Sequence, residues 1–157
     1  MVTHYKKSEF YGHGDSAPKG HIAFIGQLES DLQRFVQVVR PPSPSTLIGF
    51  SSGGGFVLRF AASEMQSAFD SYLLLAPYLG HTAPNYRPDS GGWVSVGVPR
   101  IVALNVLNAV GIRYWNDMPV VRFALTEEAK SYLTFEYDFN LNTDFAANQD
   151  YRQDLLN

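Results

Sequence analysis

The chain has 157 residues, 45% of them hydrophobic and 17% charged, which is the balance of a soluble single-domain protein. A net charge of −3 without a run of basic residues argues against a nucleic-acid partner or an anionic membrane surface. Cysteine is absent, so disulfides, thiolate metal sites and cysteine nucleophiles are excluded. No segment reads as a signal peptide or a membrane span, and we expect a cytoplasmic protein.

The first motif is Gly12-His13-Gly14-Asp15-Ser16, a turn in which two glycines flank a histidine. A histidine in this setting is most often a loop residue that is hydrogen-bonded to nearby backbone. It is more typical of a residue that shapes a corner than of one that does chemistry.

From Ile25 to Val39, apolar residues recur at helical spacing, with polar residues turned away from them. This spacing predicts an amphipathic helix. Pro41 and Pro42 follow it and end it, because proline cannot continue a helix.

Residues 46–62 predict a strand, a sharp turn and a helix. Thr46-Leu47-Ile48 is a β-prone run, and Gly49-Phe50-Ser51-Ser52-Gly53 follows it as a G-x-S-x-G pattern. Where a strand turns sharply into a helix, the central serine takes a strained backbone conformation that exposes its hydroxyl. Small residues two positions before and after keep neighbouring backbone apart. Four apolar residues of the predicted helix share one face: Phe56, Val57, Phe60 and Ala61.

This turn can supply both a nucleophile and an anion site. The first N–H groups of a helix lack intrahelical acceptors, so the Ser52 amide is placed to bind an oxyanion formed when Ser51 attacks a carbonyl. The alternative is a Gly-Ser loop that merely connects two elements. A phosphate-binding P-loop is disfavoured, because Gly55 is followed by Phe56 instead of lysine.

A second apolar strand is predicted at Tyr72–Ala76, closed by Pro77. Continuous apolar runs between amphipathic helices predict parallel strands that are covered on both faces, and therefore an α/β fold.

The character of the chain changes after Tyr78. Residues 81–93 are irregular, Val98–Val110 is apolar enough for a buried or interface helix, and Thr126 begins a short helix. Aromatic residues at this density usually belong to a core. A cap over the active site would instead place Trp93, Tyr114 or Trp115 against an apolar substrate.

These motifs resemble the α/β-hydrolase superfamily, and within it the serine aminopeptidase-like or lysophospholipase-like hydrolases. Gly12–Ser16 is similar to the family's corner after the fourth strand, residues 49–54 to its nucleophile elbow after the fifth, and Leu74–Pro77 to its sixth strand. The resemblance implies a partial α/β-hydrolase fold, with a mostly parallel sheet, flanking helices and a helical cap. It implies a partial core over 1–77 and a cap or lid over 78–157, with Ser51 as nucleophile and the Ser52 backbone N–H as oxyanion donor.

The family's triad runs in the order serine, acid, histidine. Only His81 follows Ser51, and a formal order of Ser51, Asp70 and His81 is disfavoured because Asp70 reads as a turn residue. No histidine follows any of the late aspartates, which are Asp138, Asp144, Asp150 and Asp154. The triad acid, the histidine and the second oxyanion donor are thus unassigned, and the chain resembles the middle of a larger hydrolase with both ends missing.

The leading hypothesis is a serine hydrolase that cleaves an ester, amide or peptide bond through an acyl-enzyme. Its substrate would be a small or lipid-like molecule or a peptide, and no cofactor is implied. No metal is implied either, because the histidines lack ligand spacing; they are His4, His13, His21 and His81. The alternatives are a non-catalytic protein of the same fold that binds a ligand or partner, and a structural fragment with no function of its own.

Overall fold

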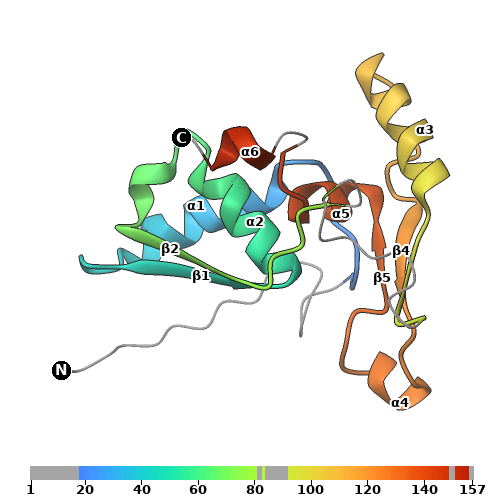
Figure 1. Cartoon of the computed structure of the whole chain (residues 1–157), viewed down its shortest axis with the longest axis horizontal. Coiled ribbons are helices and arrows are strands. Elements are labelled where there is room, and N and C mark those ends of the chain that lie inside the picture. Colours follow the sequence, from blue (N-terminus) through green and yellow to red (C-terminus); the bar gives the residue numbers. More distant parts are fainter. Residues whose placement is uncertain (1–17, 81–82, 84–91, 149–150, 156–157) are drawn as a thin grey trace.

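The computed structural model of the chain describes residues 18–80, 83, 92–148 and 151–155. Its helices are α1 (Gln27–Val39), α2 (Ser52–Ala61), α3 (Val98–Ala109), α4 (Glu127–Lys130), α5 (Phe139–Phe145) and α6 (Tyr151–Asp154), with a 3₁₀ turn at Gln66–Ala68. Its strands are β1 (Thr46–Phe50), β2 (Ser71–Leu75), β3 (Val94–Val96), β4 (Pro119–Phe123) and β5 (Glu136–Asp138). The β1–β2 pair with α1 and α2 occupies one side of the molecule, and α3, β4 and β5 occupy the other (Figure 1).

Strands β1 and β2 pair in parallel, with Thr46 opposite Ser71 and Phe50 opposite Leu75. Helices α1 and α2 cover one face of this sheet, where Leu28 and Leu32 meet Phe56 and Phe60 in a buried cluster. The other face exposes large apolar side chains: Ile48, Phe50, Leu73 and Leu75. The sequence predicts coverage on both faces; among the described residues only one face is covered.

Helix α1 confirms the amphipathic helix predicted from the apolar spacing. It ends at Val39, and Arg40 follows in a left-handed conformation directly before Pro41. The Arg40 N–H still donates to the Val36 carbonyl, so the last turn is closed before the prolines redirect the chain.

The second sheet is antiparallel, in the order β3-β4-β5. Val94 lies opposite Phe123, and Val96 lies opposite Val121. Helix α3 packs on this sheet through Ile101 and Leu104, which join a second buried cluster. A helical cap is predicted after residue 77, and helices are present there, but this sheet accompanies them. Two of its strands have three residues each, too short for an alternating pattern to be recognised in the sequence.

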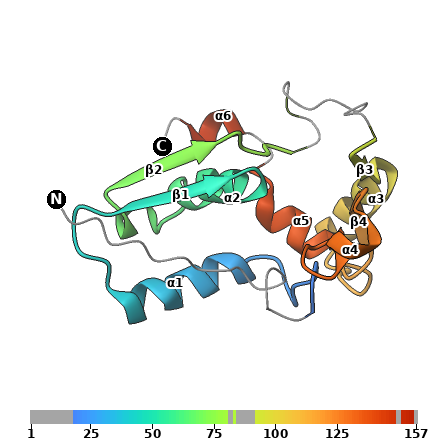
Figure 2. The same cartoon turned by 90° about the horizontal axis from the view of Figure 1, so that it is seen from below.

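Helix α5 joins the two sheets, and it lies between them in both views (Figures 1 and 2). Leu141 and Phe145 are buried in the cluster with α1 and α2, while Phe139 is buried in the cluster with α3 and β4. Tyr137, in the middle of β5, packs against both clusters. The C-terminal part of the chain therefore completes the core of the N-terminal part.

Several sequence predictions fall outside the described residues. These are the Gly12–Ser16 motif, His4, His13, His81 and Asp150. Of the helices that the structure describes, none combines the length and the apolar character needed to cross a membrane.

Candidate active site at the turn between β1 and α2

The predicted sharp turn between strand and helix is confirmed. Strand β1 ends at Phe50, helix α2 begins at Ser52, and Ser51 between them has φ 52° and ψ −118°. A non-glycine residue in such a conformation costs about 1–3 kcal/mol and persists only where its surroundings hold it. Here the Ser51 N–H donates to the Leu75 carbonyl at 3.0 Å, and the Ser51 carbonyl accepts from the Tyr78 N–H at 2.9 Å. The Ser51 side chain is exposed.

The two motif glycines contribute unequally to this turn. A Cβ on Gly49 would lie 2.1 Å from the Gly53 carbonyl oxygen, so the reversal brings backbone too close for any side chain there. A Cβ on Gly53 would meet nothing within 4 Å. The structure therefore requires glycine at position 49 and leaves room for a side chain at position 53.

Ser51 lines a cavity of about 360 Å³ that lies between the two sheets. Its lining combines the turn, the segment after β2 and the inner surface of the antiparallel sheet: Ser51, Ser52, Ala76, Pro77, Tyr78, Gly80, Trp93, Val94, Val96, Val121, Phe123, Tyr137 and Asn142. Most of these side chains are apolar, as in small-molecule sites generally.

Of the three aromatic residues predicted as substrate contacts, Trp93 lines this cavity, with its ring centroid 6.0 Å from that of Phe123. Tyr114 and Trp115 do not line it. Their rings pack edge to face against each other at 5.5 Å, and both side chains are exposed.

A few polar side chains lie among the apolar residues that line the cavity. The Tyr137 and Ser52 side chains are hydrogen-bonded, and burial raises the pKa of Tyr137 despite that bond, so its hydroxyl is protonated at neutral pH. Asn142 on α5 is 4% exposed, and its Oδ1 has no hydrogen-bond partner among the described residues. The cavity lining thus includes four polar residues beside its apolar walls: Ser51, Ser52, Tyr137 and Asn142.

Ser52 is the first residue of α2. At this position an amide N–H has no intrahelical acceptor, and the helix dipole is positive. The exposed hydroxyl of Ser51 therefore stands next to the positive end of a ten-residue helix.

Asp70 is a turn residue, as the sequence indicates. Its carboxylate accepts from the Ser45 N–H at 2.7 Å and from the Ser43 hydroxyl at 2.9 Å. The Ser45 amide, followed by the Ser43 and Ser45 hydroxyls, lowers the pKa of Asp70. Its role is to fix the loop before β1 to the start of β2.

Asp138 caps helix α5 and contacts the side chain of His21. No pattern in the sequence predicts this pair. Its Oδ1 accepts from the Leu141 N–H at 2.7 Å, and its Oδ2 lies 2.5 Å from His21 Nδ1. Burial raises the pKa of Asp138, with the Leu141 amide and His21 opposing the rise. Neither Asp138 nor His21 lines the cavity beside Ser51.

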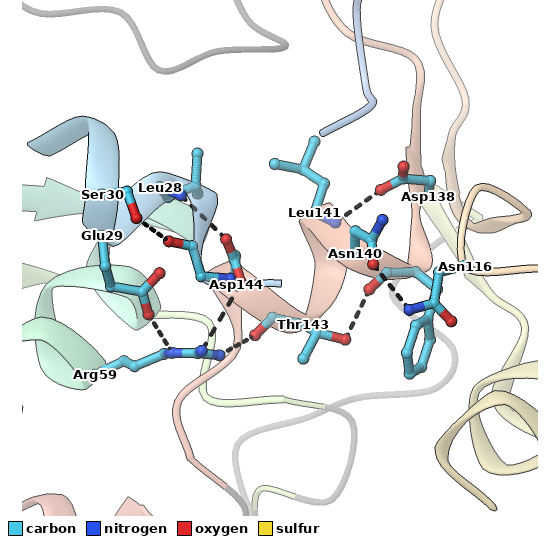
Figure 3. Close-up of polar contacts among 12 residues, drawn as sticks. Leu28, Glu29, Ser30, Arg59, Asn116, Asp138, Asn140, Leu141, Thr143 and Asp144 are labelled. Atoms are coloured by element: carbon cyan, nitrogen blue, oxygen red, sulfur yellow. Dashed lines mark hydrogen bonds and ion pairs between the residues drawn. The ribbon is translucent and has the colours of Figure 1, made fainter. Parts of the chain in front are cut away.

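Asp144 connects α5 to α1 and is fully buried (Figure 3). Its two oxygens accept from the Gly26 N–H at 2.6 Å and the Leu28 N–H at 3.1 Å, so it satisfies the first amides of α1 from a distant part of the chain. Arg59 lies 3.8 Å away and also pairs with Glu29. Burial, and then the charge of Glu29, raise the pKa of Asp144 to about 6. These contacts give Asp144 a structural role.

Sequence reasoning did not identify Tyr137 or Asn142 as site residues. Both lie in the aromatic and polar tail, where nothing in the order of residues distinguishes a side chain that lines a cavity from one that lies in the core. Only the return of α5 against α2 brings them beside Ser51.

Comparison with known proteins places this chain in a family. The family model described as "Serine aminopeptidase, S33" matches residues 8–132, a range that includes the turn at Ser51 and most of both sheets. Searches of curated proteins and of solved structures found no match. The match covers well over half of the chain, and the chain belongs to the serine aminopeptidase S33 family of the α/β-hydrolase superfamily.

Proposed function

We propose that the protein is a serine hydrolase that cleaves an ester, amide or peptide bond through an acyl-enzyme at Ser51. The observation that carries this proposal is the backbone at Ser51, which has a φ of 52° at a position that lines a mostly apolar cavity. Such strain is retained where a function depends on it.

The proposed reaction follows from the positions around the turn. The Ser51 hydroxyl oxygen attacks the substrate carbonyl carbon, and the carbonyl oxygen becomes an oxyanion. The serine proton passes to a general base, and no histidine or carboxylate is among the described residues that line the cavity. The Ser52 N–H, at the start of α2, donates to that oxyanion. The leaving group departs with a proton, and water then attacks the acyl-enzyme to release the acid and restore the hydroxyl.

The cavity supports a substrate with an apolar part. Trp93, Val96, Val121 and Phe123 form a continuous apolar wall facing the turn. Burying a chain of several carbons there would contribute about 0.8 kcal/mol per CH₂ group. The proposed substrates are small or lipid-like esters and amides, or peptides with an apolar side chain.

The test is covalent labelling with a fluorophosphonate. We expect label on Ser51 of the native chain and none on Ser51→Ala, with the adduct located by peptide mass spectrometry. Ser52→Ala retains its backbone N–H and serves as the matched control, which should still be labelled. An unlabelled native chain that nevertheless gains thermal stability with apolar esters would identify a ligand-binding protein of this fold and refute the enzyme.

A further inference from the structure

Helix α5 carries three polar side chains at alternating positions, and all three are buried: Asn140, Asn142 and Asp144. A buried polar group in a folded protein is nearly always hydrogen-bonded, and each exception calls for an explanation. The three residues can therefore be compared on the same helix at similar burial.

Asn140 is paired through both ends of its carboxamide. Its Nδ2 donates to the Ile22 carbonyl at 3.1 Å, and its Oδ1 accepts from Asn116 Nδ2 at 3.0 Å. Figure 3 shows this contact on the side of α5 that faces the antiparallel sheet. Asn140 is thus a satisfied residue of the core.

Asp144 is paired as well, through the Gly26 and Leu28 amides. Asn142 differs from both neighbours, because it lines the cavity beside Ser51 and its Oδ1 has no partner among the described residues. A leucine of similar volume would remove the cost of burying that oxygen. The unpaired oxygen belongs to the one residue of the three that lines the cavity, and that oxygen is covered in the free protein.

We infer that Asn142 is a specificity-determining residue whose carboxamide oxygen accepts a hydrogen bond from an N–H or O–H group of the substrate. The substrate is then an apolar chain that carries one hydrogen-bond donor. Two other polar side chains of the lining, Tyr137 and Ser52, are less available for that role because they bond to each other. This inference rests on the proposed function, because it assigns a substrate class to the cavity at Ser51.

A site built to bond a donor discriminates strongly against an analogue that lacks it, because the buried acceptor is then left unpaired. Apolar walls alone would not distinguish the two ligands in this way. The preference for a donor should therefore depend on the Asn142 carboxamide.

The test compares two ligand series in a Ser51→Ala background, so that no turnover occurs. N-alkylacetamides supply an N–H, alkyl acetates of the same length do not, and chains of several lengths allow the donor to reach Oδ1. Affinity is measured by isothermal titration calorimetry. We expect the best acetamide to bind about tenfold more tightly than its matched acetate, which corresponds to about 1.4 kcal/mol.

Asn142→Leu in this background should abolish that preference and raise the melting temperature of the free protein. Val96→Ala is the control: it removes apolar surface from the wall and should weaken both ligands while their ratio stays the same. If the leucine variant does not fold, Asn142→Ala provides the same comparison. Equal affinities for acetamide and acetate, or a preference that survives the loss of the carboxamide, would overturn the inference; a water held on Oδ1 would produce the first result.

Failure of the proposed function would be seen elsewhere, in the fluorophosphonate labelling of the native chain. Binding in the Ser51→Ala background does not depend on catalysis. A donor preference without labelling would support the role of Asn142 in ligand binding and refute the hydrolase.

Discussion

The two sheets of this molecule meet at one cavity but are built in different ways. The parallel sheet holds Ser51 in a strained turn that is fixed by backbone hydrogen bonds to the last residue of β2 and to the segment after it. The antiparallel sheet supplies few groups that could react. Its contribution to the cavity is mainly four apolar side chains: Val94, Val96, Val121 and Phe123. The comparison indicates that one sheet provides a precise backbone geometry and the other provides the shape and polarity of the space in front of it.

The largest expected effect comes from the closest backbone approach in the parallel sheet. Gly49→Ala would place a methyl group 2.1 Å from the Gly53 carbonyl oxygen, and relieving that overlap requires β1 to move away from α2. We expect a loss of about 3 kcal/mol in the free energy of unfolding, the upper end of the range for overpacked cores, together with loss of Ser51 labelling. Chemical denaturation measures the first effect and mass spectrometry the second.

Gly53→Ala is the matched control within the same motif. Its Cβ meets nothing within 4 Å, and alanine replaces glycine inside a helix, so stability should rise by about 0.5–1 kcal/mol. If Gly49→Ala and Gly53→Ala had the same effect on stability, the conclusion that only position 49 requires glycine would be wrong.

The next effect tests whether α5 truly unites the two sheets. Leu141 is fully buried with Phe56 and Phe60, so Leu141→Ala should cost about 2–5 kcal/mol. It should also shift the unfolding of the whole chain in one transition, measured by circular dichroism against denaturant. Leu133→Ala, at a side chain that is 53% exposed, should change little. Selective melting of the antiparallel part would show that α5 does not couple the sheets.

Asp144, which connects α5 to α1, should make the stability of the chain depend on pH. Its pKa is raised to about 6 in the folded chain from an ordinary value of 3.8, so folding favours the protonated form. The folded state then binds more protons than the unfolded state between about pH 4 and pH 6, and stability falls as the pH rises through that range. The contribution is about 3 kcal/mol at most.

Thermal melting at pH 5 and pH 7 measures this effect. The native chain should be more stable at pH 5, and Asp144→Asn should reduce the difference, because a neutral amide does not titrate. Asp70→Asn is the control of opposite sign: the pKa of Asp70 is lowered, so its contribution is present above pH 4 and is lost only below it. An unchanged pH difference in Asp144→Asn would refute the assignment.

The smallest effect concerns the strain at Ser51 itself. Glycine accepts φ 52° without steric cost, so Ser51→Gly should stabilise the chain by about 1 kcal/mol while it abolishes labelling. Ser52→Gly, at the first position of the helix, removes the hydrogen bond to Tyr137 and should instead destabilise the chain by about 0.5–1.5 kcal/mol. A Ser51→Gly variant that is less stable than the native chain would show that the turn is not strained.

Patterns that are local in the sequence predicted the parallel half of the molecule well. The spacing of apolar residues predicts α1, the run from Thr46 predicts β1, and Thr126 caps α4 by accepting from the Ala129 N–H. The tail after Tyr132 was less readable, because β5 has three residues and α5 has seven, and helical and strand periods cannot be told apart over such lengths.

The sequence by itself determined the family, the turn and the serine at its tip, because the steric demands of a sharp strand-to-helix reversal act on adjacent residues. Only the tertiary structure decided which side chains face that serine. Tyr137 and Asn142 are more than 80 positions away along the chain, and they reach the cavity because α5 buries Leu141 and Phe145 against α2. Burial of apolar surface is non-directional, so its outcome depends on the packing of the whole chain and leaves no local pattern to read.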